Sequence, residues 1–136
     1  MYETRLGKDR LARSNPFKRL VRNGFHVAFG SDGMPFHAVY GIWSAVNHPN
    51  PEHRISVEEA VRCYTYEGAY ATKEESIKGT IKEGKLADII ILSTDITLPE
   101  FCLSTNNPEI IAQKIQEIKN TKVHMTIQNG DIVYKN

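Results

Sequence analysis

A run of strand-forming residues that ends in a tight polar turn constrains the fold more than any other part of this chain. Residues 25–29 are rich in β-forming side chains and residues 30–33 read Gly-Ser-Asp-Gly, so we expect a buried strand that runs into a turn. Residues 16–22 begin with a proline suited to a first helical turn, and an Asn-Gly pair follows them. A helix that leads into a buried strand is the pattern of α/β proteins.

Helical spacing recurs after the turn. Residues 39–46 carry apolar side chains at the spacing of a helix face. Ser56 and Glu59 stand three residues apart, the spacing of a capping box, which predicts a helix from there to about Thr72. One stripe of this helix is apolar and is expected to pack inward. Three charged residues are expected to face elsewhere: Glu58, Arg62 and Glu67.

The second half of the chain predicts strands around one further helix. Residues 89–92 read Ile-Ile-Ile-Leu, a run too short to span a membrane and too β-branched for a helix, so we expect a buried strand. An Asn-Pro pair at 107–108 caps a predicted helix. Residues 123–128 and 131–135 flank the Asn-Gly pair at 129–130, which predicts a hairpin.

Composition excludes several classes of function. A chain of 136 residues with 40% hydrophobic content suits one ordinary domain. Lys and Arg number 17 against 16 for Asp and Glu, so no nucleic-acid partner is implied. The two cysteines form no C-x-x-C pair, which argues against a zinc ribbon or a redox motif. We find neither a secretory signal nor a stretch long enough to span a membrane, and therefore expect a cytoplasmic protein with no membrane partner.

Asp32 is the candidate for chemistry, and it has two interpretations. A carboxylate at the end of a strand can bind a divalent metal and take a proton from water. Alternatively, Asp32 is an Asx-turn residue that bonds a nearby backbone amide, which the local pattern alone favours. Ser31 is not a nucleophile elbow, because that motif needs a glycine where Phe29 stands. His37 is close enough in the chain to share a site with Asp32, and a surface or substrate-contacting role suits it better than metal ligation.

Spacing reveals no other site. The five histidines form no H-x-H pair and no helical H-x-x-x-H pair, so no metal cluster can be inferred from spacing. The glycine-rich turn lacks the residues of a P-loop or of a G-x-G-x-x-G motif.

Five short segments occur in order along the chain: residues 15–17, 25–32, 54–60, 79–81 and 83–88. Each is unspecific alone. The ordered set is similar to the carboxyl-terminal region of the amidohydrolase superfamily, and most of all to its branch of YtcJ-like, amidohydrolase-3 type metal-dependent hydrolases.

The resemblance implies a role for Asp32. In this family a distorted (β/α)8 barrel holds one or two divalent metals, usually zinc, and the eighth strand ends in an aspartate that matches Asp32. Asp32 would then be both a metal ligand and the general base toward the hydrolytic water. Gly33, Met34 and His37 become candidates for the loop that contacts substrate.

The resemblance also implies a division of the chain. We expect an α/β chain in which residues 1–76 form the last strand and helices of the (β/α)8 barrel. Residues 77–136 would form the carboxyl-terminal strands of a small β-sandwich domain, including the hairpin.

Most of the family's metal-binding residues have no counterparts here. The H-x-H of the first strand, the bridging lysine or acid and two later histidines are absent. The resemblance therefore implies a fragment that is inactive alone, with zinc held only in the complete enzyme and a partner chain that carries the rest of the barrel. Amides, urea-type bonds and cyclic imides all stay open as small-molecule substrates.

A second hypothesis belongs to a different class. The chain is then a non-catalytic remnant or an interaction module. A barrel strand without its neighbours exposes unpaired backbone groups, so we expect this module to self-associate or to need a partner.

Overall fold

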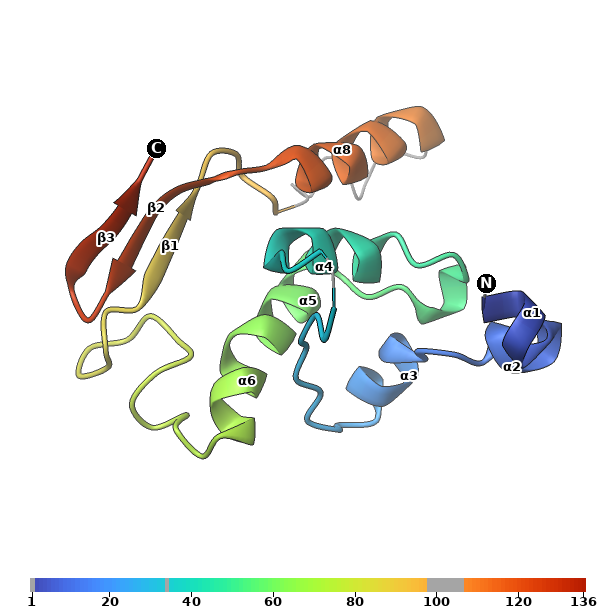
Figure 1. Cartoon of the computed structure of the whole chain (residues 1–136), viewed down its shortest axis with the longest axis horizontal. Helices are drawn as coiled ribbons and strands as arrows, with labels where there is room; N and C mark the ends of the chain where they lie inside the picture. Colours follow the sequence, from blue (N-terminus) through green and yellow to red (C-terminus); the bar gives the residue numbers. More distant parts are fainter. Residues whose placement is uncertain (1, 34, 98–106) are drawn as a thin grey trace.

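The structure, a computed structural model, describes residues 2–33, 35–97 and 107–136. Helices occupy the centre of the molecule and the end near the amino terminus, and a sheet of three strands projects at the opposite end (Figure 1). In chain order the elements are α1 (Tyr2–Leu6), α2 (Lys8–Ala12), α3 (Phe17–Arg22), α4 (Ala38–Val46), the short 3-10 helix η1 (Pro51–His53), α5 (Val57–Tyr64), α6 (Tyr66–Ala71), β1 (Ile89–Leu92), α8 (Pro108–Asn120), β2 (Val123–Gln128) and β3 (Asp131–Lys135). None of the helices within the described residues combines the length and the apolar character needed to cross a bilayer.

Local capping signals place several helix ends where the sequence predicts them. The Ser56 hydroxyl accepts the Glu59 N–H at 3.1 Å, and the Glu59 carboxylate accepts the Ser56 N–H at 2.8 Å, so the predicted capping box is present. The Asn107 side chain accepts the N–H of Glu109 at the start of α8. These bonds join residues within three positions of each other, which is why the sequence alone identifies them.

The helix predicted over residues 56–72 is present but interrupted. Thr65 has φ −115° and ψ −86°, outside the helical region, so α5 ends and α6 begins on either side of it. The outward orientation predicted for Glu67 is wrong, because this side chain is buried, with 6% of the residue exposed.

The three strands form one antiparallel sheet in the order β1-β2-β3. The predicted hairpin is confirmed, since Asn129 and Gly130 both have positive φ, 51° and 90°, between β2 and β3. The strand at 89–92 is also confirmed, but its predicted burial is wrong. β1 is an edge strand, and Ile90 and Ile91 are 53% and 42% exposed.

Residues 25–29 do not form the predicted strand. They lie between α3 and α4 without regular secondary structure. A strand needs a neighbour to complete its ladder of backbone hydrogen bonds, and no strand of the described chain lies beside this segment. Val27 and Phe29 are nevertheless half-buried while Ala28 and Gly30 are exposed, the alternation of a strand with one covered face.

The core lies between α4, α5 and α8. α4 packs against both of the other helices, and Figure 1 shows it between them. The buried apolar residues are Val39, Ile42, Ala45, Val46, Ile55, Val57, Ala60, Cys63, Ile96 and Ile118. Val27 and Phe29 pack against this cluster, so the core fixes one side of the segment that leads to Asp32.

Candidate functional site

Asp32 lies on an exposed turn directly after the segment that packs on the core. Its backbone has φ 55°, in the left-handed region that aspartate tolerates better than most residues. The N–H of Gly33 donates to the Ser31 carbonyl at 2.5 Å, which tightens the turn. The side chain of Asp32 is exposed, and it has no hydrogen bond or ion pair with any residue that the structure describes. Its carboxylate is therefore available to a ligand.

The predicted substrate-loop residues are only partly assembled around Asp32. Gly33 is exposed beside it. His37 caps α4, with its Nδ1 accepting the N–H of Tyr40 at 3.2 Å, and no hydrogen bond joins it to Asp32. Met34 lies outside the described residues. The ring nitrogen that caps α4 is thus already occupied, while the rest of the His37 side chain is exposed.

Two other histidines hold the junction between α2 and η1. The Ala12 carbonyl lies 2.9 Å from His53 Nε2 and accepts the Asn50 side-chain amide at 3.1 Å. His48 Nδ1 accepts the Asn50 N–H at 3.1 Å. The pKa of His48 is lowered, chiefly by burial; the nearby backbone carbonyl of Asn50 acts in the opposite direction, and the charges of His53 and Arg54 lower the pKa further. A cavity of about 570 Å³ adjoins this junction, but the histidines there serve the packing of the helices.

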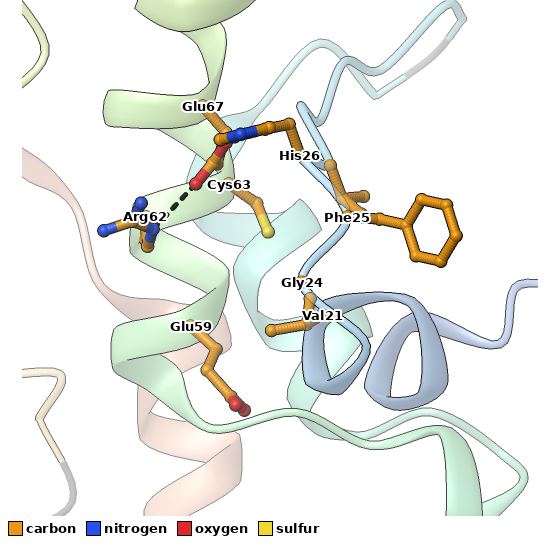
Figure 2. A pocket seen from close by; sticks show the side chains of 9 residues that line it. Val21, Gly24, Phe25, His26, Glu59, Arg62, Cys63 and Glu67 are labelled. Carbon is orange, nitrogen blue, oxygen red and sulfur yellow. Dashed lines mark hydrogen bonds and ion pairs between the residues drawn. The ribbon is translucent and has the colours of Figure 1, made fainter.

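A buried carboxylate connects the segment before Asp32 to α5 and α6. Glu67 Oε1 accepts Arg62 Nε at 2.7 Å, and Glu67 Oε2 lies 2.8 Å from His26 Nδ1. Figure 2 shows Glu67 between these two partners, at the edge of a cavity of about 140 Å³. The ring of Phe25 points away from α5 in the same view and is 63% exposed.

Sequence reasoning missed this cluster for a geometric reason. Arg62 and Glu67 stand five residues apart, and neighbours on a continuous helix stand three or four apart. The break at Thr65 brings the two side chains together. His26 stands 41 residues from Glu67, so no local pattern could have paired them.

The thiol of Cys63 lies on the same cavity. We expect iodoacetamide to leave Cys63 unmodified in the folded chain at pH 8. Burial is the main cause that raises the pKa of Cys63 to about 11, the carboxylates of Glu67 and Glu59 raise it further, and Arg62 lowers it. Only about one thiol in a thousand is then ionised at pH 8. Mass spectrometry after labelling in native buffer and in urea measures this, and equal labelling rates in both would contradict it. The other cysteine, Cys102, lies outside the described residues.

The residues present fit one ligand of a metal site, not a complete site. A catalytic zinc takes about three protein ligands. Among residues 2–33, 35–97 and 107–136, no group of three or more His, Cys, Asp or Glu side chains could hold a metal ion. Asp32 offers one exposed carboxylate, which is a suitable oxygen ligand for a divalent cation.

Comparison with known sequences identifies relatives of this chain. Residues 1–134 match the model of a family described as "Amidohydrolase family". The putative amidohydrolase YtcJ of Bacillus subtilis is 34% identical, over 96% of this chain and 24% of its own length. The 5-methylthioadenosine/S-adenosylhomocysteine deaminase of Caldanaerobacter subterraneus is 28% identical, over 87% of this chain and 28% of its own length.

A solved structure is similar in fold. Guanine deaminase of E. coli superimposes with a TM-score of 0.61 at 18% sequence identity, over 94% of this chain and 36% of that chain. The chain thus spans about a quarter of the two curated relatives and about a third of the solved one.

Proposed function

This chain belongs to the amidohydrolase family, and from that premise we propose that it supplies Asp32 to a metal-dependent enzyme that hydrolyses non-peptide or cyclic amide bonds. The other metal ligands would come from polypeptide outside residues 1–136. The observation that carries the proposal is the exposed, unpartnered carboxylate of Asp32 at the end of a segment packed on the core.

The proposal includes a place for each part of the chain. Residues 25–29 would become the last strand of a (β/α)8 barrel once neighbouring strands complete its ladder, within a barrel part that covers residues 1–76. The alternating exposure of Val27, Ala28 and Phe29 supports this placement. Residues 77–136 would contribute β1, β2 and β3 to a small β-sandwich, in a protein that we place in the cytoplasm.

Asp32 would carry the proton transfers of the reaction. Its carboxylate would accept a proton from the attacking water as the water oxygen bonds to the substrate carbon. The same proton would pass to the nitrogen as the carbon–nitrogen bond breaks. A divalent metal, zinc in our proposal, would activate the water and stabilise negative charge when bound. Gly33, Met34 and His37 would border the substrate.

Complementation tests the proposal. A neighbouring open reading frame that carries an H-x-H motif after a strand would provide the candidate partner, to be mixed with this chain and zinc. We expect hydrolysis within a panel of amides, urea-type compounds and cyclic imides for the mixture, and none for this chain alone. Near-stoichiometric zinc in the purified chain alone would contradict the proposal, because one carboxylate cannot retain the metal.

Exposed apolar surface favours a second candidate, a module that self-associates. β3 is an edge strand, and Ile132, Val133 and Tyr134 on it are 60%, 56% and 48% exposed. Unpaired edges with apolar side chains are templates for pairing with another chain.

We therefore expect the purified chain to self-associate, and we expect Ile132→Lys to have a lower average mass at the same concentration. The added charge would be buried in any pairing along β3. Gln128→Lys, on an exposed residue of β2, is the matched control. Light scattering measures the mass of all three chains, and a wild-type monomer would rule out this candidate.

A further inference from the structure

We propose that Glu67 is a positioning residue that, together with His26 and Arg62, holds the segment leading to Asp32 against α5 and α6. These three residues are called the Glu67 clasp below. Its effect on catalysis rests on the function proposed above, whereas its effect on the segment is a property of this chain alone.

The Glu67 clasp uses both oxygens of one buried carboxylate. Arg62 Nε and His26 Nδ1 lie 2.7 and 2.8 Å from the two oxygens, and the Glu67 side chain is 8% exposed. The partners are themselves supported by rings. His26 stacks on Tyr70 with ring centroids 3.8 Å apart, and the guanidinium of Arg62 lies 4.3 Å from the ring centroid of Tyr66. The imidazole and the guanidinium are therefore both held in place at the carboxylate.

The break between α5 and α6 makes the Glu67 clasp possible. Thr65 ends α5, which brings Glu67 within reach of Arg62 and points it toward His26 (Figure 2). The carbonyls in the last turn of a helix lack intrahelical partners. One of them, that of Cys63, accepts the N–H of Phe29 at 3.0 Å. The junction between α5 and α6 thus holds the segment by the Glu67 side chain at His26 and by a backbone hydrogen bond at Phe29.

Apolar packing also holds the approach to Asp32, since Val27 and Phe29 pack on the core and the Phe29 ring centroid lies 5.5 Å from that of Tyr64 on α5. Within the described residues, the contact of His26 with Glu67 is the only side-chain hydrogen bond between residues 25–33 and the two helices. Residues 30–33 are all exposed. Residues 26–29 therefore set the direction in which the chain reaches Asp32. The Glu67 clasp fixes the position of His26, the first of these residues.

Hydrogen exchange of the Phe29 amide reports on the segment directly, because this amide donates a hydrogen bond to the Cys63 carbonyl. His26→Phe keeps a ring to stack on Tyr70 and removes the nitrogen that meets Glu67. Glu67→Gln keeps the volume of the side chain and removes its charge. We expect either change to speed exchange at Phe29 about fivefold, with amides of β2 unchanged. Controls are His124→Phe and Glu58→Gln, which alter exposed residues and should leave exchange at Phe29 within about twofold of wild type.

Two results would overturn the proposal. One is exchange at Phe29 that stays within about twofold of wild type in both variants. The other is an equal acceleration in β2, which would show a general loss of stability.

The complemented enzyme gives the second readout, with the substrate that the panel identifies. We expect His26→Phe to lower kcat about tenfold with KM within about twofold of wild type, since a misplaced base slows the reaction without weakening binding. An unchanged kcat per assembled enzyme would remove the catalytic part of the proposal. If the wild-type mixture is inactive, the proposed function fails, and exchange at Phe29 still decides whether the Glu67 clasp holds the segment.

Discussion

Asp32→Asn is expected to lower the activity of the complemented enzyme about a thousandfold. General acid–base groups contribute about a hundredfold to ten thousandfold to rate, and Asp32 is proposed to serve both as base and as metal ligand. Asparagine cannot accept the proton from water. The measurement is the initial rate of the mixture with saturating zinc, normalised to the amount of assembled complex.

The structure makes this substitution a clean test. Asparagine tolerates the left-handed φ of 55° at position 32 about as well as aspartate does. The Asp32 side chain has no partner among the described residues, so the variant should fold and assemble like the wild type. Asp131→Asn, on exposed strand β3, is the matched control and should keep full activity. Retention of more than about a tenth of the activity by Asp32→Asn would exclude it as the general base.

Ile118→Ala is expected to lower the free energy of unfolding by about 3 kcal/mol. Ile118 is 2% exposed on α8 and belongs to the core formed with α4 and α5. Truncation of a buried isoleucine to alanine costs about 2–5 kcal/mol, from lost apolar burial and the cavity that remains. Urea unfolding followed by circular dichroism measures the difference. The amides of α4 should also become less protected from hydrogen exchange, because α8 packs on α4.

The matched control for this prediction is the same substitution at an exposed position. Ile132 is 60% exposed on β3, and Ile132→Ala should change the unfolding free energy by less than about 1 kcal/mol. Equal losses for the two variants would show that α8 is not part of the core. The comparison is best made at concentrations where the wild-type chain is a monomer, because Ile132 also lies on the proposed association surface.

The Glu67 clasp was not predicted from the sequence. Glu67 was expected to face outward because it is charged, yet position 67 lies seven residues from the buried Ala60, which places it on the same face of a helix. The break at Thr65 brings Arg62 within reach of Glu67, and the carboxylate is buried with both Arg62 and His26 as partners. A buried carboxylate without such partners would be strongly unfavourable.

The sequence by itself determined the features that depend on neighbours a few residues away. The capping box at Ser56, the cap at Asn107 and the turn at Asn129 were all predicted correctly, because their hydrogen bonds and backbone angles are local. The ordered set of short segments also predicted the family. The role of Asp32 stays a prediction, since its partners would lie on other polypeptide.

Only the tertiary structure decided which groups are buried and which are paired. Residues 25–29 have strand-like composition, yet a strand exists only where another strand completes its hydrogen bonds, and the described chain places none there. Ile90 and Ile91 are apolar, yet they stay exposed on an edge strand. Burial and pairing depend on what lies opposite a residue in space, and that information is distributed over the whole polypeptide and not over a few adjacent residues.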